Sequence, residues 1–270
     1  MRISAVELVP FHVLPYSPGT TPGAPAAALP FYRAFVDELP EALDAIVAAA
    51  DLQGVADVGG AVVGLGEALP RAIDRLRDDR RLPGRGRTAG ILGGDLHDRA
   101  DEDDVSPAWL AMANVCRWVA GVAGNHDRFG PPGSEAVAVE MLSRTNAFVL
   151  DGSTVTLDGL RVGGLSGIVN PASGARLRRE EAFVAALSAV VQRDCDVLVL
   201  HDGPNVAGTR LPGWPSLRRV LEAAPPMLVI RGHDHWEEPV AELRNGTQVL
   251  NVEGRVVVLQ RRTGGAKGGT

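Results

Sequence analysis

The segment VAGVAGNHDRFG, residues 119–130, joins a run of small apolar residues to three polar residues in a row. The apolar run has the length and composition of a buried strand, and Gly124 suits the tight turn that ends it. Such a turn has no need of Asn125, His126 and Asp127. An amide, an imidazole and a carboxylate delivered together by one strand therefore indicate a chemical site.

Four other apolar runs of strand length also end in polar residues. Their continuous apolar character is typical of strands that are buried on both faces. The carboxyl ends of strands in α/β sheets share one edge, where ligands bind, so we expect the polar side chains to converge there. The five runs with their polar ends are DAIVAAADLQ (44–53), AGILGGD (89–95), VAGVAGNHD (119–127), CDVLVLHD (195–202) and PMLVIRGHDH (226–235).

Helical patterns alternate with these strands, which predicts an α/β fold built from layers. Two further segments, 154–167 and 240–260, have hairpin patterns with Asp-Gly and Asn-Gly as their turn pairs. We therefore expect a mixed sheet, or two stacked sheets with flanking helices. The predicted helices are EALPRAIDRLRDD (67–79), SPAWLAMANVCRW (106–118), SEAVAVEMLSRT (134–145) and RREEAFVAALSAVVQR (178–193).

The chain contains no linker-like stretch between its ends, so we expect a single domain over residues 1–260 and a flexible tail over 261–270. Residues 1–40 precede the first buried strand and are expected to pack on the domain as an N-terminal extension that adds a strand. Within it, the Pro, Gly and Ala of residues 16–30 predict a loop. The segment FYRAFVDELPEAL, 31–43, is interpreted as a short helix.

The composition limits the classes of partner. The formal net charge is −6, whereas nucleic-acid-binding domains are usually basic, so extended DNA or RNA is not expected. No apolar segment approaches the ~18 residues of a membrane span, so we expect no membrane partner. The only two cysteines, Cys116 and Cys195, lie in apolar runs, which favours reduced thiols in a cytoplasmic protein. The oligomeric state is left open.

The polar ends of the strands combine imidazole with carboxylate, which suits first-row divalent ions such as Mn, Fe, Zn or Ni. Four of the six histidines belong to this set. A carboxylate can bridge two ions, and two ions about 3.5 to 4 Å apart can clamp a phosphoryl group during an in-line displacement. The sequence therefore predicts a dinuclear metal centre.

The order of the polar blocks resembles the signature of the calcineurin-like metallophosphoesterase superfamily, D-x-H, GD, GNH(D/E), H and GHxH. The resemblance implies a four-layer α/β sandwich in which helices flank mixed β-sheets. It also implies a phosphohydrolase in which a hydroxide held between two metal ions attacks a phosphomonoester, a phosphodiester or a nucleotide diphosphate. The matching blocks are GGDLHD (93–98), AGNHDR (123–128), LHDGP (200–204) and RGHDHW (231–236).

The resemblance also assigns roles to residues. His126 would be the catalytic imidazole that assists the leaving group, and Asp127 would orient it. Arg99 and Arg128 are candidates for contact with substrate phosphate. For Arg99, an exposed salt bridge is an equally good interpretation. The implied metal ligands are Asp51, Gln53 and His235 at the first ion, Asp95 as the bridge, and Asn125, His201 and His233 at the second.

The first block departs from the family pattern, because it reads Asp51-Leu52-Gln53 in place of D-x-H. An amide oxygen is a harder and weaker ligand than imidazole, so the change favours Mn over Zn at the first site. The manganese-dependent ADP-ribose/CDP-alcohol diphosphatases of this superfamily are similar in having D-x-Q here. A small phosphorylated or nucleotide-like substrate is therefore expected.

Two other functions stay open at this stage. The loss of histidine at Gln53 is compatible with a metal-deficient member of the fold that acts as a binding scaffold. A nuclease for short substrates is also compatible with the motifs. Trp214, in the loop 203–216, has the chemistry to stack on a base or to pack on the protein itself.

Overall fold

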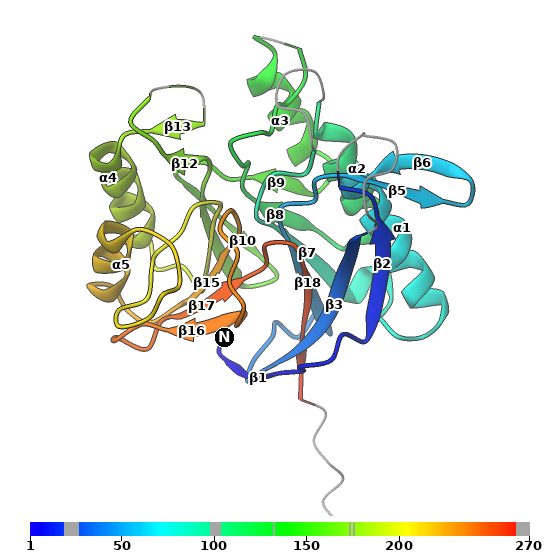
Figure 1. The fold of residues 1–270 in the computed structure, drawn as a ribbon, viewed down its shortest axis with the longest axis horizontal. Helices are drawn as coiled ribbons and strands as arrows, with labels where there is room; N and C mark the ends of the chain where they lie inside the picture. Colours follow the sequence, from blue (N-terminus) through cyan, green and yellow to red (C-terminus); the bar gives the residue numbers. More distant parts are fainter. Residues whose placement is uncertain (19–26, 98–103, 132, 173, 175, 263–270) are drawn as a thin grey trace, which may run out of the picture.

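Two mixed β-sheets packed face to face form the centre of the molecule, and helices cover their outer faces (Figure 1). This arrangement confirms the expected α/β sandwich of four layers. The structure is a computed structural model, and it describes residues 1–18, 27–97, 104–131, 133–172, 174 and 176–262. Within the described residues, every helix is too short or too polar to cross a membrane.

The first sheet has the strand order β1-β3-β18-β4-β7-β8-β9, with β2 also paired to β3. Strands β4, β7, β8 and β9 run parallel, so their carboxyl ends lie on one edge. The bounds are β1 (Ile3–Val6), β2 (His12–Tyr16), β3 (Ala27–Val36), β4 (Ala45–Ala49), β7 (Thr88–Leu92), β8 (Val119–Gly121), β9 (Ala147–Val149) and β18 (Val256–Arg261).

The second sheet has the order β10-β11-β14-β15-β17-β16, and its four central strands are parallel. Both predicted hairpins are present, as β10–β11 and β16–β17. The strand after the second hairpin, β18, leaves this sheet and joins the first one. The bounds are β10 (Ser153–Leu157), β11 (Leu160–Leu165), β14 (Val197–Leu200), β15 (Leu228–Arg231), β16 (Val240–Glu242) and β17 (Gln248–Asn251). Two small ribbons pair β5 (Val55–Val58) with β6 (Ala61–Gly64) and β12 (Ile168–Val169) with β13 (Leu177–Arg178).

The helices form the two outer layers. Helices α1 (Leu65–Asp78), α2 (Ser106–Val115) and α3 (Glu135–Ser143) pack on the first sheet, and α4 (Glu180–Val191) and α5 (Pro215–Glu222) pack on the second. A short 3₁₀ turn covers Arg85–Arg87. The four helices predicted between the buried strands are all present. Helix α5 was not predicted. It is only eight residues long. Its first residue is a proline, which usually indicates a loop although the first turn of a helix accepts it.

Strand β4 shows why the apolar runs lack alternation. Ala45 and Val47 belong to the cluster under α1 and α2, whereas Ile46 and Ala48 belong to the cluster between the two sheets. Successive side chains of a strand point to opposite faces, and both faces of β4 are buried in the core. The pattern predicted from sequence is therefore confirmed for this strand.

The N-terminal extension differs from its prediction in one element. Residues 31–36, interpreted as the start of a helix, belong instead to the strand β3, which pairs with β18 in parallel register. The cause is a partner more than 200 residues away, and such pairing overrides local propensity. Residues 27–30 of the predicted loop also belong to β3, and residues 19–26 lie outside the described part of the chain. The expected extra strand is present, since β1, β2 and β3 all join the first sheet.

We propose that the extension and the rest of the chain unfold as one unit. Phe31 is fully buried and packs edge-on against Phe11. Phe31→Ala is expected to lower the free energy of unfolding by about 3–5 kcal/mol, measured by urea denaturation, because it leaves a cavity in the shared core. The control Val62→Ala, at a side chain that is 70% exposed, is expected to change it by less than ~0.5 kcal/mol. Equal effects of the two changes would contradict a shared core.

Candidate metal centre

The predicted ligands lie directly after the carboxyl ends of strands from both sheets. The expectation of one shared sheet edge is therefore corrected: the site spans the facing edges of two sheets, a division that strand patterns do not reveal. Three strands of the first sheet and two of the second contribute. Asp51 follows β4, Asp95 follows β7, Asn125 follows β8, His201 follows β14 and His233 follows β15.

Hydrogen bonds to Asp51 join the loops of the two sheets. The Asp51 N–H donates to the Gly94 carbonyl at 2.9 Å, within the first sheet. The His233 N–H, from the second sheet, donates to Asp51 Oδ2 at 3.0 Å. A Cβ atom at position 232 would lie 2.3 Å from the same carboxylate oxygen, so only glycine allows this approach.

Three of the predicted ligands have left-handed backbone conformations. The φ angles are 54° at Asp51, 53° at Asp95 and 69° at His233. Residues other than glycine adopt this region at a cost of roughly 1 kcal/mol or more, and such residues cluster at functional sites. Three of the seven described non-glycine residues with positive φ are therefore predicted ligands.

Asp51, Asp95 and His201 form the centre of the site. One ligand atom from each lies within 4.8 Å of the others. His201 Nε2 lies 3.3 Å from Asp95 Oδ2, and the His201 and His233 rings are 5.1 Å apart. His201 Nδ1 is 2.8 Å from the Gly93 carbonyl, which fixes the ring with Nε2 toward the carboxylates, the arrangement common for metal-binding histidines.

Asp95 is the most highly connected side chain of this centre. Its Oδ1 accepts a hydrogen bond from the His126 N–H at 2.9 Å, and its Oδ2 faces both His201 and the side chain of Gln53, whose Nε2 donates at 3.4 Å. A Cβ atom at position 124 would lie 1.9 Å from Asp95 Oδ1. The glycine of the GNHD turn is therefore required for the turn to reach the carboxylate.

The electrostatics of the centre favour added positive charge. Burial raises the pKa of Asp51 to about 7, and the neighbouring charge of Asp95 acts in the same direction. Burial alone would lower the pKa of His201, but its contact with Asp95 raises that pKa to about 9. Two neighbouring carboxylates at this place favour a compensating positive charge, which a divalent cation would supply.

Two buried ligand atoms have no hydrogen-bond partner among the described residues. They are Asn125 Oδ1 and His201 Nε2, both predicted metal ligands, and His201 Nε2 faces Asp95 Oδ2 at 3.3 Å without forming a hydrogen bond of good geometry. Buried polar atoms are nearly always paired, and leaving one unpaired costs about 1–3 kcal/mol. An amide oxygen, an imidazole nitrogen and two carboxylates are ligands of first-row divalent ions. The residues therefore fit the metal that the motifs imply.

Asp127 was expected to contact the His126 ring, but its carboxylate contacts backbone N–H groups instead. Its two oxygens accept hydrogen bonds from the backbone N–H groups of Asp95, Leu96 and Gly124, at 2.8 to 2.9 Å. This corrects the expected contact, because a fully engaged, buried carboxylate holds the two loops together instead. Burial raises the pKa of Asp127, and the charge of Asp95 adds to the effect.

A cavity of about 400 Å³ opens onto the centre. His126 is one of the residues in its wall. Two residues that the motifs missed, Tyr16 and Glu253, also line it. Glu253 follows the apolar strand β17 in the segment VLNVEG, so the rule of a polar residue after a buried strand would have found it. The lining residues are Tyr16, Pro18, Asp51, Gln53, Asp95, His126, His233, Glu253 and Gly254.

His235 and Arg128 lie outside the central group of Asp51, Asp95 and His201. The His235 side chain is 65% exposed, and its Nδ1 lies 2.6 Å from Glu253 Oε2. It is not part of the group formed by Asp51, Asp95 and His201 among the described residues. Arg128 is exposed and lines a neighbouring cavity of about 150 Å³. Arg99 lies outside the described residues.

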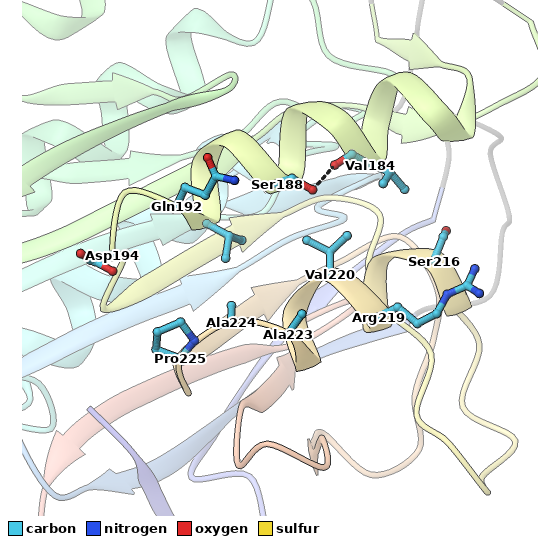
Figure 2. A pocket seen from close by; sticks show the side chains of 11 residues that line it. Val184, Ser188, Gln192, Asp194, Ser216, Arg219, Val220, Ala223, Ala224 and Pro225 are labelled. Atoms are coloured by element: carbon cyan, nitrogen blue, oxygen red, sulfur yellow. Dashed lines mark hydrogen bonds between the residues drawn. The ribbon is translucent and has the colours of Figure 1, made fainter.

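A larger groove of about 630 Å³ lies between α4 and α5, on the outer face of the second sheet (Figure 2). Valine and alanine side chains form much of its wall, and none of the predicted metal ligands contributes to its described lining. Trp214 packs on the protein itself: its Nε1 donates to Asp202 Oδ2 at 2.7 Å, and its ring packs against the core under these helices. Trp214 is only partly buried and also lines a cavity of about 510 Å³, so both interpretations of this residue stay open.

The chain belongs to the calcineurin-like phosphoesterase family, because the model of that family, "Calcineurin-like phosphoesterase", matches residues 45–237. It is accordingly a phosphoester hydrolase of a family that depends on divalent metal ions. The superfamily and the α/β fold expected from the motifs are both confirmed. No curated protein matches the sequence.

Two solved structures illustrate the similarity. The chain is 16% identical to the protein TT1561 of Thermus thermophilus, with a TM-score of 0.55 over 77% of this chain and 88% of that one. This similarity supports the fold alone. The chain is also 16% identical to a novel archaeal phosphodiesterase, over 77% of this chain and 82% of that one, but the TM-score of 0.36 is too low for further comparison.

Asp127→Asn tests the structural role of this carboxylate. The amide presents an N–H₂ group to one of the three backbone N–H donors, so we expect a loss of about 1–3 kcal/mol in the free energy of unfolding and weaker Mn²⁺ binding in calorimetry. The control Asp44→Asn removes a surface pair with Arg87 and is expected to cost under ~1 kcal/mol. Full stability and full Mn²⁺ affinity in Asp127→Asn would rule out the role of this carboxylate in holding the loops.

Proposed function

We propose that this protein is a dinuclear-metal-dependent phosphohydrolase acting on a small phosphorylated or nucleotide-like substrate. The observation that carries the proposal is the group of Asp51, Asp95 and His201, whose ligand atoms lie within 4.8 Å of one another, together with the buried, unpartnered Asn125 Oδ1. Asp51 and Asp95 line a cavity of about 400 Å³, which is large enough for a small substrate. This donor set is suited to two cations and to a phosphoryl group between them.

The proposed ligands divide into two sets that share Asp95. Asp51, Gln53 and His235 complete the first set, and Asn125, His201 and His233 complete the second. Manganese is the proposed ion, because the amide oxygen of Gln53 is a hard ligand, and Fe, Zn and Ni are the alternatives. When bound, such ions supply an activated water and neutralise charge on the phosphoryl oxygens.

The residues around the proposed ligands hold the centre in shape. The Gly93 carbonyl fixes the His201 ring, and the Asp127 carboxylate fixes the backbone of Asp95. Rigid support of this kind keeps reacting groups in place without reorganisation during the reaction. We therefore propose that the site holds a phosphoryl group beside the Asp51 and Asp95 carboxylates, which line the cavity.

His126 is the proposed catalytic imidazole. The backbone N–H of His126 donates a hydrogen bond to Asp95 Oδ1, and the residue lines the cavity. An imidazole there can transfer a proton to the departing oxygen of the substrate. Arg128, and Arg99 beyond the described residues, are proposed to contact substrate phosphate. Asp127 assists indirectly, by fixing the turn that carries His126.

A metal-deficient scaffold is the competing function. The scaffold interpretation rests on Gln53 alone, whereas the other ligand types of the family signature are all retained. The strained φ angles of Asp51, Asp95 and His233 are costly features that a scaffold has no reason to keep. We also propose a cytoplasmic location, which the two buried free cysteines support.

Metal addition separates these two functions. Mn²⁺ at 100 times its dissociation constant is expected to stabilise the metal-stripped protein by about 2.7 kcal/mol per site, seen as a rise in melting temperature. Asp95→Asn is expected to remove most of that rise, because Asp95 is shared by both ligand sets. A melting temperature of the wild-type protein that ignores Mn²⁺ would favour the scaffold.

Hydrolysis tests the proposed chemistry. With Mn²⁺ and bis(p-nitrophenyl) phosphate or p-nitrophenyl phosphate, His126→Ala is expected to lower kcat by about 10²- to 10⁴-fold while Mn²⁺ affinity is retained. Asp95→Asn is expected to lose both activity and metal. Glu242→Gln, at an exposed salt bridge on the edge of the second sheet, is the matched control and should keep both. Full activity in either site variant would contradict the proposal.

A further inference from the structure

One wall of the catalytic cavity comes from outside the segment that matches the family. The family model covers residues 45–237, whereas Tyr16 and Glu253 line the cavity together with the proposed ligands. Tyr16 ends the strand β2 of the N-terminal extension, and Glu253 lies in the loop between β17 and β18. We call these two side chains the outer wall.

Tyr16 is held in place by the loop that follows Asp51. The next residue, Ser17, pairs with Val55 through two backbone hydrogen bonds of 2.8 and 3.0 Å. Gly54 allows the tyrosine ring to approach, because a Cβ atom there would lie 2.9 Å from Tyr16 Cδ2, and its φ of 118° also favours glycine. The extension is therefore anchored directly beside the proposed ligand Gln53.

Backbone contacts also hold Glu253 in place. Its backbone forms a bridge with Ala50, the residue before Asp51, and its N–H donates to Asn251 Oδ1 at 3.1 Å. Its carboxylate is 2.6 Å from His235 Nδ1, and the side chain is 23% exposed. The carboxylate is thus fixed at the margin of the cavity and keeps contact with solvent there.

The Glu253 carboxylate belongs to the lining of the cavity, together with Tyr16 and Asp51. Burial raises the pKa of Tyr16, and the charge of Glu253 adds to the effect. The Tyr16 hydroxyl can donate a hydrogen bond. The nearby guanidinium of Arg255 donates to the backbone carbonyls of Glu253 and Trp236, so it does not pair with the carboxylate.

We propose that the outer wall selects phosphoryl groups that carry a single negative charge, as in phosphodiesters and substituted diphosphates, over dianionic phosphomonoesters. The fixed charge of Glu253 opposes the second charge of a monoester, and Tyr16 donates a hydrogen bond to a phosphoryl oxygen. This proposal rests on the hydrolase function proposed above and specifies its substrate class.

The test compares a diester with a monoester at pH 8, where the monoester is fully dianionic. For Glu253→Gln with Mn²⁺, the ratio of kcat/KM for bis(p-nitrophenyl) phosphate to that for p-nitrophenyl phosphate is expected to fall about fivefold, mainly through a lower KM for the monoester. That size is expected of one unit charge acting across several ångströms of solvated cavity. Tyr16→Phe is expected to lower kcat/KM for the diester about fivefold. Glu242→Gln serves again as the carboxylate control.

A binding measurement gives a result that does not depend on turnover. Inorganic phosphate, which is mostly dianionic at pH 8, is expected to bind Mn²⁺-loaded Glu253→Gln about fivefold more tightly than the wild type in calorimetry. Both comparisons use Mn²⁺ at a concentration that saturates each variant, because Glu253 also contacts the proposed ligand His235 and its replacement is expected to weaken Mn²⁺ binding.

The outcomes separate the two proposals. An unchanged substrate ratio and unchanged phosphate affinity in Glu253→Gln would overturn the outer wall, even if hydrolysis depends on Asp95. Hydrolysis by the wild type that persists in Asp95→Asn would instead overturn the hydrolase mechanism, while the phosphate-binding result would still decide the charge effect.

Discussion

The buried carboxylate of Asp95, at the junction of two sheets, is the constraint on which the rest of the site depends. A negative charge in such a place is stable only with donors and cations around it. The chain brings the His126 N–H, the side chain of Gln53 and the His201 ring to this carboxylate, from separate strands. Burial acts to raise the pKa of Asp95, but the contact with His201 holds it below its usual value. The surroundings of Asp95 therefore favour its charged form.

The backbone around Asp95 follows from that constraint. Glycine is required at position 124 so that the turn can reach the carboxylate, and at position 232 so that a second turn can reach Asp51. Asp127 collects three backbone N–H groups that would otherwise be unpaired in the interior. The strained φ angles of the ligands are maintained by these contacts and by the core between the sheets.

Much of this arrangement could be predicted from sequence, because the signals are local. The apolar runs before Asp95 and before the GNHD turn predict two buried strands, β7 and β8, and place these polar residues at their carboxyl ends. The features that were missed depend on distant partners. Strand β3 was interpreted as a helix because its neighbour β18 lies at the other end of the chain. The division of the ligands between two sheets, the hydrogen bonds of Asp127 and the contributions of Tyr16 and Glu253 to the cavity all arise from tertiary contacts.

Anomalous diffraction from crystals grown with Mn²⁺, recorded above the manganese absorption edge, tests the central claim most directly. The account predicts two anomalous peaks about 3.5 to 4 Å apart, one on each side of the Asp95 carboxylate, with Asn125 and His201 both at the second peak. An ordered site with no anomalous peak, or with a single ion that does not contact Asp95, would contradict a dinuclear centre built on this residue.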